Sequence, residues 1–145
     1  MDRTIAIVGV GNMGGGMAGR LCDLGWRVHA CDLVASRVQA CVLQGARAAA
    51  TPADAAAGAD ALIVSVVDAD EMNEVLFGVA GAAAVLSPAA AVLLCPTVAP
   101  NDVERIAARL GEHGLAAIDA PMSGGPGRAR DGSMSLMVAC ADAVF

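Results

Sequence analysis

Five glycines occupy eight positions near the N-terminus, where "GVGNMGGG" covers residues 9–16 directly after the apolar run "TIAIV". Gly9, Gly11 and Gly14 have the spacing G-x-G-x-x-G. Between a strand and a helix, these glycines permit a sharp turn, close approach of the backbone to a pyrophosphate and tight helix–strand packing. The free N–H groups at the helix start attract phosphate. The motif predicts a diphosphate-binding turn, although a plain glycine-rich turn, a flavin site or an S-adenosylmethionine site can share it.

An acid follows at the end of the second expected strand. Asp32 lies 18 residues after Gly14, where a carboxylate can accept hydrogen bonds from both ribose hydroxyls of an adenosine. The alternative is an acid that caps a helix or stabilises a turn. A carboxylate at this position repels a 2′-phosphate, and the next residue is Leu33 instead of arginine. The sequence therefore favours NAD over NADP.

Two further loops follow expected strands. One is Val67-Asp68-Ala69 and the other is Cys95-Pro96-Thr97, in which the Thr97 hydroxyl can face a nicotinamide amide. Open α/β sheets bind their ligands at the carboxyl ends of the strands, which is where both loops lie. For each loop taken alone, the residues favour an ordinary strand-to-helix turn.

The stretch "DAPMSGGPGRARDGSMSLMV" covers residues 119–138. Within it, Ser123, Gly124 and Gly125 present consecutive backbone amides that no large side chain covers. Such a nest binds anions, and the ligand expected beside a nicotinamide ring is a small carboxylate. A flexible Gly-Pro-Gly hairpin turn is the alternative interpretation.

These residues must be positioned by alternating strands and helices. Hydrophobic periodicity predicts strands over 5–8, 27–31, 46–50, 61–67, 91–95, 115–119 and 133–138. It predicts helices over 12–24, 37–44, 70–77 and 100–113, with Ser36 capping the second, a short helix after Thr51-Pro52 and another starting at 142–145. Strands separated by helices pair in parallel through right-handed crossovers. The expected fold is one doubly wound α/β domain, because 145 residues suit a single domain.

Composition narrows the function classes. A net charge of −6 and a pI of 4.6 argue against nucleic-acid binding. The longest apolar stretch, 82–100, is interrupted by prolines and is shorter than the ~20 residues that span a bilayer, so no membrane segment is expected. No secretory signal is visible, and five widely spaced cysteines without a C-x-x-C pair indicate free thiols of a reducing cytoplasm. A metal site is not expected.

Three motifs together resemble a known family. "IAIVGVGNMGGGMAGRL", "CPTVAP" and "DAPMSGGPGRARDGSMSLMV" are similar, in order and over almost the whole chain, to N-terminal signatures of the β-hydroxyacid dehydrogenases. That family includes 3-hydroxyisobutyrate dehydrogenase, tartronate-semialdehyde reductase and L-threonate dehydrogenase. Two positions depart from it: Pro96 stands where members often have serine, and Asp68 where many have proline.

The resemblance implies a Rossmann domain that binds NAD and a small hydroxy-carboxylic acid. It implies a role for Ser123, Gly124 and Gly125 in holding the substrate carboxylate. It implies that the cofactor-binding residues are Gly9, Gly11, Asn12, Met13, Gly14, Asp32, Val67, Asp68 and Thr97. The full-length parent is then expected to be a homo-oligomer.

The chain contains no lysine, because all nine of its basic residues are arginines. In the family that this sequence resembles, the general acid/base is a lysine beyond the Rossmann domain, followed by an all-helical domain. We therefore expect residues 1–145 to be the NAD-binding domain of a longer two-domain enzyme, without that helical domain and without a catalytic residue of its own. The alternative is a non-catalytic dinucleotide-binding module derived from the same family.

Overall fold

A computed structural model describes residues 3–144 of the chain. Six parallel strands form its main sheet in the order β3-β2-β1-β4-β5-β6. Their bounds are β1 Thr4–Val8, β2 Arg27–Cys31, β3 Arg47–Ala48, β4 Ala61–Val64, β5 Ala91–Leu94 and β6 Ala116–Asp119. The strand order reverses direction between β1 and β4, which opens a crevice at their carboxyl ends. The expected doubly wound, mostly parallel sheet is confirmed.

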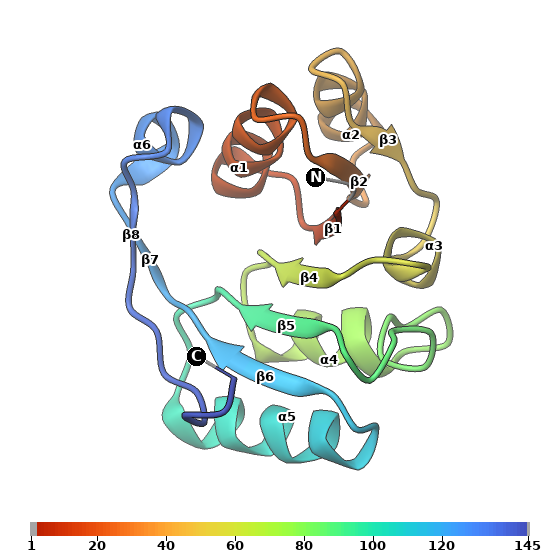
Figure 1. Cartoon of the computed structure of the whole chain (residues 1–145), viewed down its shortest axis with the longest axis vertical. Coiled ribbons are helices and arrows are strands. Elements are labelled where there is room, and N and C mark those ends of the chain that lie inside the picture. The colour runs from red at the N-terminus through yellow and green to blue at the C-terminus, as the bar shows by residue number, and fades with distance from the viewer. Residues whose placement is uncertain (1–2, 145) are drawn as a thin grey trace.

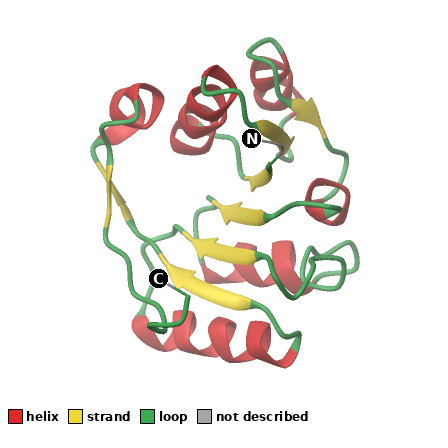
Figure 2. Cartoon of the chain, in the orientation of Figure 1, coloured by secondary structure: helices red, strands yellow, loops and turns green. Residues whose placement is uncertain are grey.

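Helices cover both faces of this sheet. Their bounds are α1 Asn12–Asp23, α2 Ala35–Val42, α3 Pro52–Ala56, α4 Ala69–Phe77, α5 Pro100–Glu112 and α6 Gly125–Asp131. Figure 1 shows α1 and α2 on one side of the sheet and α4 and α5 on the other, and Figure 2 shows the same layers by type of structure. No helix among residues 3–144 is both long enough and apolar enough to cross a membrane.

Alternating side chains of β1 divide the interior into two cores. Ile5 and Ile7 belong to the core beneath α1 and α2, whereas Ala6 and Val8 belong to the core that contains α4 and α5. All residues of β1 are buried, as expected for a central strand covered on both faces. This double burial explains why the strand reads as a continuous apolar run.

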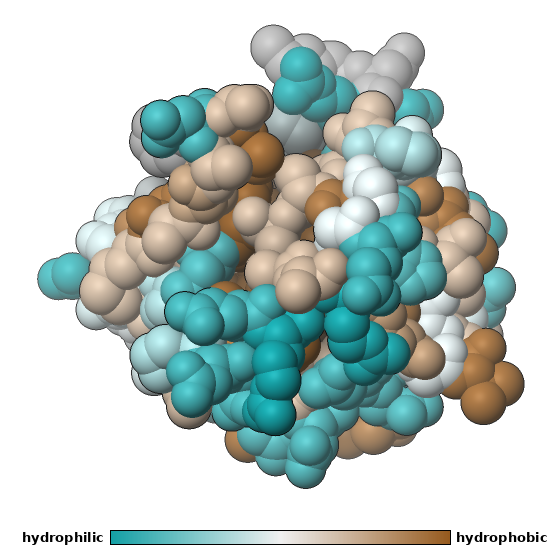
Figure 3. All heavy atoms as spheres, turned by 90° about the horizontal axis from the view of Figure 1, so that it is seen from below, coloured by the Kyte–Doolittle hydropathy of each residue, from teal (hydrophilic) through white to brown (hydrophobic). Residues whose placement is uncertain are grey.

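The helix α5 is strongly amphipathic. Ile106 and Leu110 are buried against the sheet, while Glu104, Arg105 and Arg109 are exposed. Figure 3 views the molecule from the side on which α5 lies nearest, and hydrophilic residues gather there. The helix predicted over 100–113 is thereby confirmed, and its apolar residues recur with helical spacing on the buried side.

Some element boundaries differ from the predictions. The second helix begins at Ala35 with Val34 as its N-cap, so Ser36 does not cap it. The backbone amide of Val34 donates to the Asp32 carboxylate at 2.8 Å, which stabilises this turn in place of a serine hydroxyl. The strand β4 ends at Val64 instead of residue 67, and β3 contains only two residues.

The segment after β6 forms an arm that the sequence did not predict correctly. Met122–Ser123 (β7) and Ser135–Leu136 (β8) form a small antiparallel sheet, and α6 lies between them. Asp119 and Ala139 exchange two backbone hydrogen bonds of 2.9 Å at the base of the arm. The expected long strand over 133–138 is therefore wrong. Residues 142–144 form a turn in place of the expected helix start, and position 145 lies outside the described residues.

The arm packs against α1 where the sequence has additional glycines. A Cβ at Gly16 would lie 3.1 Å from the Ala129 Cβ and 3.1 Å from the Pro126 carbonyl oxygen. Ala129 is itself buried. Glycine at position 16 therefore lets α1 and α6 approach closely, which gives a structural reason for a glycine that the dinucleotide motif does not require.

Gly14→Ala and Gly111→Ala add the same methyl group to a helix. Position 14 is crowded, whereas position 111 is open. A Cβ at Gly14 would overlap the Gly9 carbonyl oxygen, whereas nothing lies within 4 Å of one at Gly111. We expect Gly14→Ala to lower the free energy of unfolding by about 1–3 kcal/mol. Gly111→Ala should raise it by about 0.5–1 kcal/mol. Urea unfolding measures the free energy of unfolding of each variant. If the two substitutions changed it in the same direction, the described packing would be contradicted.

Asp119 should make stability depend on pH. Its buried Oδ1 has no hydrogen-bond partner among residues 3–144, and burial raises the pKa of its carboxyl group. An acid whose pKa is higher in the folded than in the unfolded chain stabilises the fold at pH values below its ordinary pKa of 3.8. This stabilisation is lost as the pH rises through the pKa of the folded state. Relative to the parent, Asp119→Asn should therefore gain stability between about pH 3.5 and 7. Denaturation across that range tests this, and a pH-independent difference would contradict it.

Candidate dinucleotide-binding site

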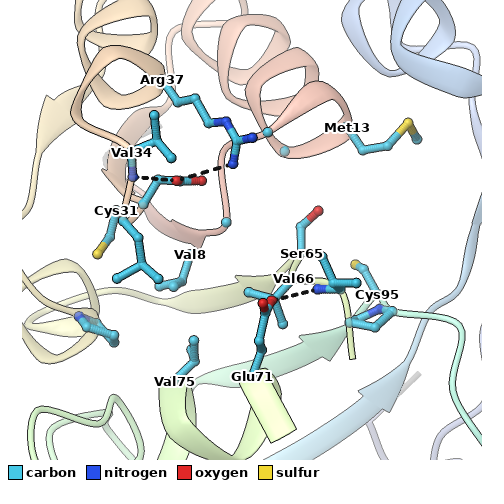
Figure 4. Close-up of a pocket in the computed structure, with 18 of the residues that line it drawn as sticks. Val8, Met13, Cys31, Val34, Arg37, Ser65, Val66, Glu71, Val75 and Cys95 are labelled. Atoms are coloured by element: carbon cyan, nitrogen blue, oxygen red, sulfur yellow. Dashed lines mark hydrogen bonds and ion pairs between the residues drawn. The ribbon is translucent and has the colours of Figure 1, made fainter. Parts of the chain in front are cut away.

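A pocket of about 950 Å³ opens at the carboxyl ends of the strands. It lies over the point between β1 and β4 where the strand order reverses, and residues from α1, α2 and α4 line it. Figure 4 shows side chains from these elements converging on one space. This volume is at the upper end of the range for small-molecule sites, so the pocket can accept a ligand as large as a dinucleotide.

The glycine turn brings three backbone segments into contact at the pocket floor. Gly9 has φ +88°, a conformation that residues with a Cβ rarely adopt. A Cβ there would overlap the backbone carbonyl of Ser65 at the end of β4, and one at Gly14 would overlap the carbonyl of Gly9. The space beside the turn therefore remains free of side chains only because these positions are glycine.

The N-terminus of α1 offers free donors to the pocket. Its N-cap, Gly11, supplies no side-chain hydrogen bond, whereas the Thr51 hydroxyl caps α3 and the Asp68 carboxylate caps α4. The first N–H groups of a helix have no partner within it, and the helix dipole makes this end positive. Gly11, Asn12 and Met13 all line the pocket, so these donors lie where a diphosphate would bind.

Asp32 is held in place by backbone amides on both of its oxygens. Its Oδ2 accepts from Val10 N at 2.9 Å, and its Oδ1 accepts from Val34 N at 2.8 Å. Its side chain is only 7% exposed, and the Arg37 guanidinium lies 3.5 Å away. A carboxylate has about four acceptor sites, and the two backbone amides and Arg37 Nη1 use three of them, which leaves capacity for one ribose hydroxyl. Asp32 therefore links the glycine turn to the start of α2 at the edge of the pocket.

One wall of the pocket comes from α4. Glu71 and Val75 reach from this helix into the pocket (Figure 4), and the Glu71 Oε2 accepts from Val67 N at 2.9 Å. Asp68 does not line the pocket, because its carboxylate turns to the helix and accepts from Glu71 N at 2.9 Å. The first turn of α4 thus directs one acid into the pocket and the other onto the backbone.

The opposite end of the pocket is lined by Met13, Cys95, Thr97, Met122 and Gly125. Cys95 is buried, and burial together with the charge of Asp119 raises the pKa of its thiol to about 12. At neutral pH this thiol is protonated and therefore a poor nucleophile. This end of the pocket can enclose a flat ring between soft, apolar side chains, but it contains no activated cysteine.

Nine of the twelve residues predicted for the site line the pocket, and three do not. Ser123 and Gly124 lie in β7 and at the N-cap of α6, beside the pocket-lining Gly125, and Asp68 caps α4. The nine lining residues are Gly9, Gly11, Asn12, Met13, Gly14, Asp32, Val67, Thr97 and Gly125. Their proposed contacts with a cofactor and a substrate remain predictions.

Sequence reasoning missed the pocket residues that come from α2 and from the connection into α3. Arg37 lies one turn into α2, and Ala50 and Pro52 come from the connection into α3. Glu71 had a visible signal, because Asp68-x-x-Glu71 is the spacing of a helix N-cap with an acid at the third helical position. The apolar lining residues carry no comparable signal.

Neither histidine lines the pocket. The His29 Nδ1 lies 2.9 Å from the Ala55 carbonyl oxygen, and the His113 ring stacks on Phe77 at a centroid distance of 5.8 Å. Within residues 3–144, no group of three or more His, Cys, Asp or Glu side chains is placed to hold a metal ion.

Comparisons with known proteins agree on one family for this chain. Residues 4–145 match the family described as the NAD-binding domain of 6-phosphogluconate dehydrogenase. L-threonate dehydrogenase of Cupriavidus necator is 41% identical over 137 residues, which are 94% of this chain and 46% of that protein. NAD-dependent L-serine dehydrogenase of Pseudomonas aeruginosa is 39% identical over 137 residues, which are 94% and 46% of the two chains. The chain thus spans about half the length of these relatives.

Solved structures agree with the sequence comparisons. The crystal structure of 3-hydroxyisobutyrate dehydrogenase from Salmonella typhimurium superposes with a TM-score of 0.93 and 35% identity, covering 99% of this chain and 50% of that one. The resemblance to β-hydroxyacid dehydrogenases is thereby confirmed. The chain belongs to the family of NAD-binding domains found in 6-phosphogluconate dehydrogenase and in the hydroxyacid dehydrogenases related to it.

Proposed function

We propose that the chain is one domain of an enzyme that transfers a hydride between a small 3-hydroxy acid and NAD. One observation carries this proposal: the uncapped N-terminus of α1 and the buried Asp32 carboxylate lie on the same pocket. Relatives named for L-threonate, L-serine and 3-hydroxyisobutyrate support a small hydroxy acid as the substrate class.

The pocket fits NAD in its donors and acceptors. Backbone amides at Gly11, Asn12 and Met13 would hold the diphosphate, and Asp32 would accept from the adenosine ribose. The end lined by Met13, Thr97 and Met122 would enclose the nicotinamide, which supplies the hydride acceptor when bound. The chain's own residues would orient this ring.

The arm supplies the candidate carboxylate site. Gly124 and Gly125 have φ values of +125° and +75°, so a side chain at either position would be strained. The consecutive amides of Ser123, Gly124 and Gly125 would act as a nest for the substrate carboxylate, with the Ser123 hydroxyl as an additional donor. Gly125 lines the same pocket as Thr97, which supports a substrate bound next to the nicotinamide.

The base for the reaction would come from outside these residues. The chain has no lysine, and neither histidine reaches the pocket. The matched relatives are about twice as long, which supports a second domain that provides the base and closes the substrate site. By itself the 145-residue chain would bind the dinucleotide, as the alternative of a non-catalytic module also requires.

Asp32→Ala tests the ribose contact. Losing charge-assisted hydrogen bonds of about 1.5–3 kcal/mol should weaken NAD binding at least about ten-fold in calorimetry. NADP should bind the parent more weakly than NAD, and Asp32→Ala should narrow that difference because it removes the repelling carboxylate. Asp70→Ala removes an exposed acid of α4 that does not line the pocket and serves as the control. Equal affinity of the parent for NAD and NADP would contradict the assignment.

The 145-residue chain should bind NAD without reducing it. Mixed with NAD and L-threonate, L-serine or 3-hydroxyisobutyrate, it should give no increase in absorbance at the wavelength of the reduced nicotinamide. Calorimetry on the same sample should still show NAD binding. Steady formation of reduced nicotinamide would mean that the described domain already contains a general base.

A further inference from the structure

Two sets of contacts hold the arm against the rest of the fold. At its base, Asp119 and Ala139 exchange two backbone hydrogen bonds of 2.9 Å. At its other end, α6 packs alongside α1, and Figure 1 shows α6 beside α1 and away from β6. Because β7 and β8, which connect α6 to the base, contain only two residues each, the position of α6 depends on its contact with α1.

An ion pair joins the two helices at the C-terminal end of α1. The Arg130 Nη1 lies 2.5 Å from the Asp23 Oδ2, and both side chains are about half exposed. On the way to Asp23 the arginine passes Gly19, where a Cβ would lie 3.0 Å from the Arg130 Nε. The lack of a side chain at position 19 therefore lets the arginine lie across α1 and reach the acid.

A second arginine, Arg20 of α1, lies against the end of α6. Gly132 ends this helix in a left-handed conformation with φ +83°, and a Cβ there would lie 2.8 Å from the Arg20 Nε. The last turn of α6 thus meets α1 through charged groups. Gly16 and Ala129 form the apolar part of the same contact.

We propose that Asp23 and Arg130 are positioning residues whose ion pair fixes α6 along α1 and thereby holds the start of α6 at the pocket. Apolar contacts are non-directional, whereas an ion pair joins two defined atoms and so determines how far one helix lies along the other. The helix α6 is short and continuous, so a shift at Arg130 also moves Gly125, which lines the pocket. Neither Asp23 nor Arg130 lines the pocket itself.

This role separates the positioning residues from the site that they affect. Asp23 is the last residue of α1 and Asn12 is the first, so about 16 Å of helix lies between them. The effect on a substrate rests on the proposed function, in which Ser123, Gly124 and Gly125 hold a carboxylate. The effect on the position of the arm does not depend on any ligand.

Trypsin tests the position of α6 in the ligand-free chain. Cleavage after Arg128 requires α6 to leave α1, because the next residue, Ala129, is only 2% exposed. Asp23→Asn removes the ion pair at nearly constant shape. It should raise the cleavage rate at this bond about two- to five-fold, which is the effect expected for an exposed ion pair. In about 1 M sodium chloride, which screens the pair, the variant and the unsubstituted chain should be cleaved at similar rates.

Two controls separate this effect from a general loss of stability. The bond after Arg105 in α5 also precedes a buried residue, Ile106, and its cleavage rate should be the same in Asp23→Asn as in the unsubstituted chain. Asp102→Asn removes the ion pair between Asp102 and Arg105 within α5. This substitution should leave cleavage after Arg128 unchanged.

Exchanging the two charges tests the pairing directly. Asp23→Arg brings two guanidinium groups together and should raise cleavage after Arg128 more than Asp23→Asn does. Adding Arg130→Asp restores opposite charges in reversed order, which should return the rate to within about two-fold of that of the unsubstituted chain. Each rate is divided by that of a free peptide of residues 121–138 with the same residue at position 130. An unchanged rate in Asp23→Asn, an equal rise after Arg105, or no recovery in the double variant would overturn the inference.

Calorimetry distinguishes failure of this inference from failure of the proposed function. NAD should bind Asp23→Asn and the unsubstituted chain with affinities within about two-fold, because position 23 lies outside the pocket. 3-Hydroxyisobutyrate should bind the NAD-loaded variant about two- to five-fold more weakly than the NAD-loaded unsubstituted chain. Equal binding of this acid by both chains would overturn the positioning role. A chain that binds NAD but not the acid would overturn the proposed carboxylate site, and the trypsin result would still decide the role of the ion pair.

Discussion

The close approach of three backbone segments at the end of β1 is the constraint on which the site depends. The chain turns at Gly9 next to the Ser65 carbonyl, and Gly14 packs against the carbonyl of Gly9, so neither position has room for a Cβ. Asp32 reinforces the bend from the next strand, because its carboxylate accepts the amide of Val10. The free start of α1, the Asp32 carboxylate and the end of β4 are thereby fixed relative to one another. The pocket follows from this arrangement, since α4 and the arm complete walls around it.

The sequence predicted most of what this constraint positions. The central strand β1 is covered on both faces and apolar, so its pattern stands out clearly, and the amphipathic α5 has a regular helical period. The glycine spacing and Asp32 could be interpreted because their chemistry requires particular residue types. Thr51 was identified as a helix cap because a hydroxyl before proline is a local signal.

The missed features depend on contacts that are distant in the sequence. The helix α6 begins with "GPG", which favours a turn locally, yet packing of Ala129 against Gly16 stabilises it as a helix. The strand expected over 133–138 is mostly loop, because it pairs with only two residues of β7 and lies at the edge of the molecule. Arg37 and the apolar residues near α3 reach the pocket only through the fold, so local patterns could not identify them.

The contact between α1 and α6 connects two regions beside the pocket. The first turn of α1 carries backbone amides that no side chain caps, and the start of α6 carries Gly124 and Gly125. Because these helices touch through Gly16 and Ala129, and the arm is closed at its base by Asp119 and Ala139, the separation of the two regions is set by rigid packing. The distance between the start of α1 and the start of α6 is therefore determined when the two helices pack against each other in the folded chain.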